Sequence, residues 1–200
     1  AIPNYKKKKW KYHFNNNVKR YLLEDIDEFS SALKYFAYAI NGRSFLSFLE
    51  TITGDEHLIP DPYFMGGGAM ATGKGGFLKI HLDYNFHHKL QSWRRVNALF
   101  YLNKNWKKEW GGNLILENNS KSASIEPKFN RLVIFTLSKN SFHGQPEPLN
   151  CPKNQFRNVF SSFYYTSKNH KDMTNKPHFT LYDIKKSPYA NSILKNYQKK

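Results

Sequence analysis

Short segments rich in β-branched and aromatic residues, separated by turn residues, dominate the chain from about residue 60 to residue 166. Segments of this kind predict β-strands. We place strands near residues 76–83, 94–102, 112–117, 122–126, 131–136, 142–146 and 157–166. A series of strands at roughly ten-residue spacing is typical of an antiparallel β-sandwich or jelly roll. The pattern therefore predicts a mainly β protein.

Helical periodicity precedes this region. Between Glu24 and Ile40, apolar residues recur at three- and four-residue steps, which predicts an amphipathic helix. After Asn41-Gly42, a second short helix is predicted from Ser44 to Thr51, ending near Gly54. Two helices followed by many strands indicate flanking α-helices packed on the major sheet.

The 200 residues fit one globular domain. We divide it into a basic arm or short strand (1–20), a helical support (24–54), a β core (60–166) and a basic C-terminal extension (167–200) with a last helix around residues 190–197.

The single cysteine, Cys151, excludes an intramolecular disulfide framework and is expected to be non-catalytic. No apolar run approaches the roughly 20 residues that span a bilayer, so we expect a soluble, cytoplasmic protein without a membrane partner.

The formal net charge of +16 would attract nucleic acids, acidic proteins or anionic small molecules. Abundant lysine together with asparagine is also typical of general compositional bias. No signature of a nucleic-acid-binding module is present. We therefore do not expect nucleic acid as a partner, and the oligomeric state stays open.

One triplet suggests a chemistry. His81 and Asp83 alternate across Leu82, so on a strand their side chains point to the same face, and His143 in Phe142-His143-Gly144 can complete a three-point site. Two imidazoles and one carboxylate form the facial triad that suits non-haem Fe(II) and leaves three coordination positions open. Taken alone, such a triplet is more commonly made of hydrogen-bonded strand histidines that bind no metal, so its structural context decides.

A second group lies on the strand predicted at 157–166. Arg157, Val159, Ser161 and Phe163 share one face, so a guanidinium and a hydroxyl project from an apolar wall. A buried arginine needs an anionic partner, either a protein carboxylate or a ligand carboxylate, and no acidic residue nearby in the sequence is an obvious mate. A metal and an arginine together favour 2-oxoglutarate, whose oxo-acid end can chelate Fe(II) while its distal carboxylate meets Arg157.

An ordered series of motifs surrounds these residues. The motifs are Gly75–Asp83, Arg95–Trp106 with Tyr101-Leu102-Asn103, Gly111–Leu114, Ile125–Phe135, Phe142–Gly144 and Arg157–Tyr165. Together, from about Gly66 to Thr166, they resemble the prolyl 4-hydroxylase-like branch of the Fe(II)- and 2-oxoglutarate-dependent dioxygenases, which includes the hypoxia-factor prolyl hydroxylases and bacterial relatives.

The resemblance implies a double-stranded β-helix, the cupin-like jelly roll. It also implies roles for seven residues: His81, Asp83 and His143 as catalytic iron ligands, Arg157 as the anchor of the distal carboxylate, Tyr101 and Ser161 as hydrogen-bonding partners of that carboxylate, and Leu114 as an apolar wall. For Tyr101, packing in the core is an equal alternative, because an inward tyrosine contributes a large apolar body as well as its hydroxyl.

The resemblance further implies that Fe(II), 2-oxoglutarate and O₂ serve to hydroxylate an unactivated C–H bond with release of succinate and CO₂, with ascorbate as reductant. A prolyl residue in a protein or peptide is the expected substrate. The alternatives are a free amino acid, sugar or other small metabolite, and, in another class, a non-catalytic jelly-roll binding module. Asp83 favours a hydroxylase over an iron halogenase, and Phe163 stands where nucleic-acid demethylases carry a second arginine.

Some positions depart from the family pattern. Ten residues before His81, relatives often place a polar or aromatic pocket residue, whereas this chain has Ala71. The spacing between His143 and Arg157 is longer than in the hypoxia-factor enzymes, which predicts an inserted turn around 146–153. His87 and His88 are expected to be solvent-facing in a loop over the site, and substrate specificity is expected in 55–75 and 84–94.

Overall fold

The computed structural model describes residues 9–118 and 121–182. The predicted helix around residues 190–197 lies outside this part of the chain. The helices are η1 (Ile26–Glu28), α1 (Ser31–Asn41), α2 (Arg43–Thr53) and η2 (Lys108–Trp110). The strands are β1 (Lys11–Phe14), β2 (Val18–Leu23), β3 (Ile59–Pro60), β4 (Gly68–Thr72), β5 (Phe77–Leu82), β6 (Phe86–His87), β7 (Ser92–Tyr101), β8 (Leu114–Glu117), β9 (Ser122–Ile125), β10 (Leu132–Thr136), β11 (Phe142–Gln145), β12 (Arg157–Thr166) and β13 (Leu181–Tyr182).

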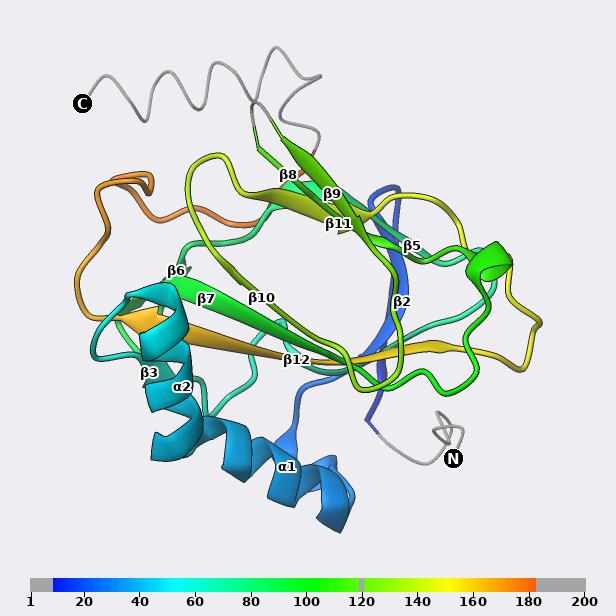
Figure 1. Ribbon diagram of the computed structural model, residues 1–200, viewed down its shortest axis with the longest axis horizontal. Coiled ribbons are helices and arrows are strands. Elements are labelled where there is room, and N and C mark those ends of the chain that lie inside the picture. The colour runs from blue at the N-terminus through cyan, green and yellow to red at the C-terminus, as the bar shows by residue number, and fades with distance from the viewer. Residues whose placement is uncertain (1–8, 119–120, 183–200) are drawn as a thin grey trace.

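The strands form two facing layers, as Figure 1 shows. One layer has the order β10-β7-β12-β4 and the other the order β5-β11-β8-β9. Strand β2 is hydrogen-bonded to β4 on one side and to β5 on the other, so it joins the two layers into one continuous sheet. All the ladders are antiparallel. This is the predicted jelly roll, the double-stranded β-helix.

Helices α1 and α2 cover the outer face of the layer that contains β7 and β12 (Figure 1). Ala37 and Ile40 of α1 pack in one core cluster with Phe160 of β12. Leu49 of α2 packs in a second cluster with Tyr164 of β12. The packing of the helices on the major sheet is therefore as predicted, and no described helix is both long and apolar enough to cross a membrane.

The first helix begins later than the apolar pattern predicts. Phe29 is extended, and the hydroxyl of Ser30 accepts a hydrogen bond from the backbone N–H of Leu33, which caps α1. A serine in extended conformation at this position begins a helix because it satisfies one of the free N–H groups of the first turn. The segment from Glu24 to Phe29 therefore contributes the short helix η1 and not a longer α1.

The predicted core strands are all present, with ends shifted by at most two residues, and β12 has the predicted bounds. Strand β4 was not predicted, and half of β2 lies in the segment interpreted as a basic arm or short strand. Both are central: β4 lies between β12 and β2, and β2 lies between β4 and β5. Gly68–Thr72 lacks the bulky β-branched residues that mark a strand, so its structure follows from its partners.

Candidate metal centre and central pocket

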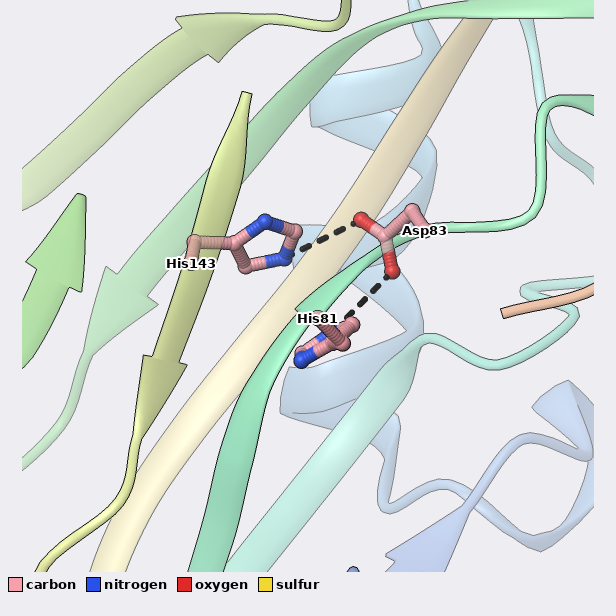
Figure 2. Close-up of side chains that lie close together, drawn as sticks. All are labelled: His81, Asp83 and His143. Carbon is pink, nitrogen blue, oxygen red and sulfur yellow. Dashed lines mark ion pairs between the residues drawn. The ribbon is translucent and has the colours of Figure 1, made fainter. Parts of the chain in front are cut away.

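The structure brings the three predicted metal ligands together. His81 lies near the end of β5, Asp83 follows that strand, and His143 on β11 is the direct cross-strand partner of His81. Their candidate ligand atoms all lie within 4.8 Å of one another. The Nε2 atom of His81 is 3.4 Å from Oδ1 of Asp83, and the Nε2 atom of His143 is 3.1 Å from Oδ2 (Figure 2). We call these residues the His–Asp–His cluster.

Hydrogen bonds define which imidazole nitrogen faces the centre. The Nδ1 atom of His81 is 2.8 Å from the carbonyl oxygen of Lys79, and that of His143 is 3.3 Å from the carbonyl oxygen of Ser141. A carbonyl only accepts, so each Nδ1 donates and Nε2 is the nitrogen that faces Asp83. Burial, together with the neighbouring His143, lowers the pKa of His81 and favours its neutral form. Two imidazole nitrogens and a carboxylate converging in this way suit a metal cation between them.

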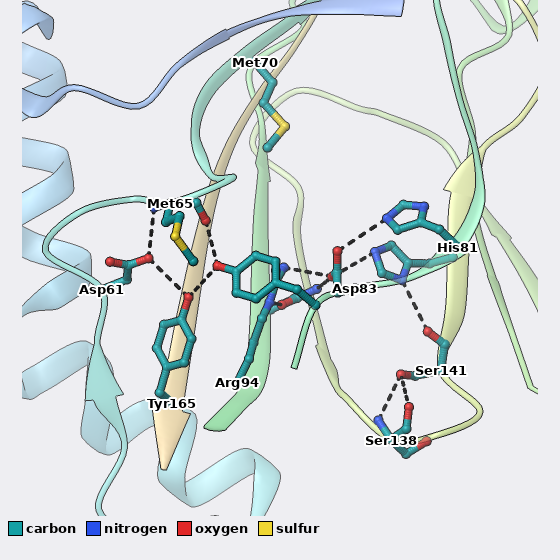
Figure 3. A network of polar contacts seen from close by, with 12 residues as sticks. Asp61, Met65, Met70, His81, Asp83, Arg94, Ser138, Ser141 and Tyr165 are labelled. Atoms are coloured by element: carbon teal, nitrogen blue, oxygen red, sulfur yellow. Dashed lines mark hydrogen bonds and ion pairs between the residues drawn. The ribbon is translucent and has the colours of Figure 1, made fainter. Parts of the chain in front are cut away.

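Two side chains that the sequence analysis did not identify hold Asp83 in place. The guanidinium of Arg94 donates from Nη2 to Oδ2 of Asp83 at 2.8 Å, and the amide of Asn97 donates to the same oxygen at 2.8 Å (Figure 3). Arg94 is itself buried, and its guanidinium lies over the ring of Phe163 at 3.3 Å from the centroid. Burial alone would raise the pKa of Asp83, but the charge of Arg94 and the two histidines hold it well below its usual range.

A backbone irregularity explains why this pair was missed. The register between β7 and β12 shifts between Tyr164, which pairs with Val96, and Tyr165, which pairs with Arg94. The extra residue, Arg95, breaks the simple alternation, so Arg94 and Asn97 both reach Asp83 although three positions separate them.

The four predicted co-substrate residues line the same pocket as the His–Asp–His cluster, which we call the central pocket. Arg157 donates from Nε to the carbonyl oxygen of Gly112 at 2.7 Å and from Nη2 to the hydroxyl of Tyr101 at 3.2 Å. No carboxylate of the described residues lies within ion-pair distance of Arg157. The buried hydroxyl of Ser161 has no hydrogen-bond partner among the described residues, and Leu114 contributes part of the apolar wall.

These residues fit a metal-chelating dicarboxylate. The His–Asp–His cluster offers nitrogen and oxygen ligands suited to a divalent ion. Elsewhere on the wall, Arg157 has guanidinium N–H groups to spare and Ser161 has an unused hydroxyl, which are the donors that a second carboxylate needs. Gly112 makes the approach of Arg157 possible, because a Cβ atom there would lie 3.0 Å from Cδ of Arg157.

Tyr101 packs in the core and also contacts Arg157, the predicted co-substrate anchor. Its side chain is fully buried and packs with Val133 and Val159, while its hydroxyl meets Arg157. Burial raises the pKa of Tyr101, so the hydroxyl keeps its proton and can donate to an anion as well as accept from the guanidinium.

The structure also shows where Ala71, His87 and His88 lie relative to the central pocket and to solvent. Ala71 does not line the central pocket, whereas its neighbours Met70 and Thr72 do, because side chains alternate along β4. His87 is fully buried, with Nε2 3.6 Å from the buried carboxylate of Asp61, so its expected exposure was wrong; a short strand, β6, takes it into the interior. His88 is exposed as predicted.

Comparisons with known proteins agree with this geometry. A family model described as the 2OG-Fe(II) oxygenase superfamily matches residues 67–165, which include the cluster and Arg157. No curated protein sequence matches the chain.

Solved structures with the same fold include a prolyl-4-hydroxylase from Pseudomonas putida, which has a TM-score of 0.55 and 18% sequence identity over 80% of this chain and 79% of that one. A viral collagen prolyl hydroxylase from Paramecium Bursaria Chlorella virus-1 has a TM-score of 0.49 and 14% identity over 75% and 79% of the two chains. A Trichoplax adhaerens prolyl hydroxylase, solved with a hypoxia inducible factor peptide, has a TM-score of 0.41 and 24% identity over 70% and 56%. The superfamily uses Fe(II), 2-oxoglutarate and O₂. Its sequence pattern, the jelly roll and the His–Asp–His cluster are all present in this chain. The chain therefore belongs to the 2OG-Fe(II) oxygenase superfamily.

Proposed function

We propose that this protein is an Fe(II)- and 2-oxoglutarate-dependent hydroxylase that acts on a prolyl residue of a protein or peptide and releases succinate and CO₂. The observation that carries the proposal is the pairing, in one pocket, of the His–Asp–His cluster with an arginine that has no protein carboxylate. One part of the pocket suits a metal ion, and the other suits the distal carboxylate of the co-substrate.

Each residue then has a defined role. His81, Asp83 and His143 hold Fe(II), which together with 2-oxoglutarate and O₂ supplies the oxidising chemistry. Arg157 binds the distal carboxylate, with Tyr101 and Ser161 as further hydrogen-bond partners and Leu114 as the apolar wall beside them. Arg94 and Asn97 orient the Asp83 carboxylate, and the two histidines are oriented by backbone carbonyls.

The substrate class rests on similarity. The solved structure with a TM-score of 0.55 is a prolyl-4-hydroxylase, and the motif series resembles that branch of the superfamily. Asp83 supplies the carboxylate that a hydroxylase needs at this position. A small-metabolite hydroxylase and a non-catalytic binding module are the competing functions, and the experiment below separates them.

The test is incubation of the protein with Fe(II), 2-oxoglutarate and ascorbate, first with prolyl peptide libraries and then with host extract. Mass spectrometry should detect a product that is heavier by one oxygen atom, and succinate should form in proportion. Asp83→Ala should abolish both signals, whereas Asp27→Ala, which removes a largely exposed carboxylate, should not. An oxygenated small molecule in place of a peptide would replace the prolyl assignment, and failure to bind Fe(II) and 2-oxoglutarate would refute the proposed function.

A further inference from the structure

A second arginine reaches the central pocket from the strand that joins the two layers. Along β2, Val18, Arg20 and Leu22 lie on one face and Lys19 and Tyr21 on the other. Arg20 lines the central pocket together with the His–Asp–His cluster and Arg157, whereas Lys19 does not. Arg20 is the last residue of the predicted basic arm and has no predicted role.

Arg20 has no anionic partner among the described residues. Its Nη1 lies 3.2 Å from the sulfur of Met70, and its buried Nε has no hydrogen-bond partner. The acidic side chain nearest in sequence, Glu24, instead binds Lys11 at 2.8 Å and accepts a hydrogen bond from the backbone N–H of Gly66. Arg20 is only half-buried, but a guanidinium whose buried N–H lacks a partner is costly, so the position favours an anion from outside the protein.

Arg20 lines the same pocket as the metal ligand Asp83 and the predicted co-substrate anchor Arg157, and both charges act on it. Burial is the main reason that the pKa of Arg20 is lowered; the neighbouring Tyr182 and, less strongly, Asp83 oppose this effect, and Arg157 adds to it. Asp83, however, is already hydrogen-bonded by Arg94 and Asn97. Asp83 therefore influences Arg20 through space and is not its ion-pair partner.

Neither carboxylate of the co-substrate needs Arg20 as a partner. Under the proposed function, one carboxylate of 2-oxoglutarate belongs to the metal and the other to Arg157. Both negative charges of the co-substrate, and that of Asp83, are then matched without Arg20. The remaining molecule that enters this pocket is the primary substrate.

We propose that Arg20 binds a carboxylate of the primary substrate, so that the protein selects acidic substrates. This inference rests on the proposed function and deepens it. A planar guanidinium suits a carboxylate because it offers two parallel N–H donors. The carboxylate can be the free α-carboxylate of a small substrate or an acidic side chain beside the target residue of a peptide.

The first test needs no variant. Mn(II) and 2-oxoglutarate are bound to the full chain without oxygen, and the affinities of matched acid and amide probes are measured calorimetrically. One pair is N-acetyl-L-proline and its amide; the other is a short capped peptide with glutamate or glutamine beside proline. In at least one pair the acid should bind about tenfold to a hundredfold more tightly, as expected for a charge-assisted hydrogen bond. The preferred pair identifies the source of the carboxylate.

Variants then assign the preference to Arg20. Arg20→Met should reduce it to less than about twofold, and Arg20→Lys, which keeps the charge but not the planar donors, should leave an intermediate preference. Lys19→Met is the matched control, because it removes one positive charge from the adjacent residue on the other face of β2. Thermal unfolding of each variant reports whether it is folded.

The outcomes distinguish an incorrect role for Arg20 from an incorrect proposed function. A wild-type protein that binds 2-oxoglutarate but binds no acid more tightly than its amide would overturn the role of Arg20 and leave the proposed function intact. The role is also overturned if Arg20→Met weakens 2-oxoglutarate binding as strongly as Arg157→Met does, because Arg20 would then belong to the co-substrate. A wild-type protein that binds neither Mn(II) nor 2-oxoglutarate refutes the proposed function itself.

Discussion

Replacing Arg94 with methionine would leave the Asp83 carboxylate buried without its cation. The Arg94 side chain is 2% exposed and that of Asp83 is 11% exposed, and Nη2 is 2.8 Å from Oδ2. Removing one partner of a buried ion pair typically costs about 3–5 kcal/mol. We expect about 3 kcal/mol here, at the low end, because Asn97 still donates to the same oxygen and the methionine side chain can still pack on Phe163.

The assay is thermal unfolding of the protein after metal chelation. For a chain of this size, 1 kcal/mol corresponds to roughly 2–4 °C, so Arg94→Met should lower Tm by roughly 6–12 °C. Arg43→Met is the matched control: the Arg43 side chain is 73% exposed and pairs with Glu50 at 2.9 Å, and Glu50 still accepts from the backbone N–H of Leu58 without it, so the change should cost less than about 1 kcal/mol. Adding Asp83→Asn to Arg94→Met removes the unpaired charge and should recover part of the lost stability.

Two results would refute this reasoning. One is an Arg94→Met protein that is no less stable than Arg43→Met. The other is a double variant with the same Tm as Arg94→Met, which would mean that the unpaired carboxylate is not the source of the instability.

Four further predictions concern the same pocket. Arg157→Met should weaken 2-oxoglutarate binding about a hundredfold and Arg157→Lys by less, as measured calorimetrically with Mn(II); unchanged affinity would contradict the anchor role. Tyr101→Phe should weaken it about tenfold, less than Arg157→Met, because the hydroxyl that is lost carries no charge and the guanidinium stays in place; a loss as large as that of Arg157→Met would mean that the hydroxyl does more than assist Arg157. Gly112→Ala should lower both 2-oxoglutarate affinity and Tm, since the glycine has a φ of 87° and a new Cβ would press on Arg157; retention of both would show that the loop adjusts freely. The pKa of His81 is lowered by burial and by His143, so the unfolded chain binds its proton more readily, and the unfolding free energy of the metal-free protein should fall as pH drops below about 6.5. His81→Asn should make this pH dependence shallower in urea unfolding, and an unchanged slope would exclude His81 as its source.

Local sequence pattern predicts the long strands well. Strand β12 is rich in β-branched and aromatic residues over its ten residues and is buried on both faces, and its bounds were predicted correctly. Strand β4, Gly68–Thr72, contains two alanines and a glycine, and it is a strand because β12 and β2 pair with it on both sides. Pairing of this kind depends on residues distant in sequence, which local propensity does not describe.

The same distinction applies to the site. His81, Asp83 and His143 were predicted together because two share a strand face and the third lies in a recognisable motif. Arg94 was missed because a bulge in β7 changes its direction, and Arg20 was missed because it lies among many lysines near the start of the chain. A charged residue that turns inward cannot be distinguished by composition from one that faces solvent.

The position of β2 also has a consequence for the order of folding. Tyr21 pairs with Ala71 and Val18 pairs with Leu78, so this strand is synthesised long before either of its partners. Closing such long loops costs conformational entropy before the new contacts repay it, and pairing of this kind is slow. His81 pairs with His143 across a similar separation, so the joint between the two layers and the metal centre both depend on slow, long-range pairing, and neither can form from local contacts alone.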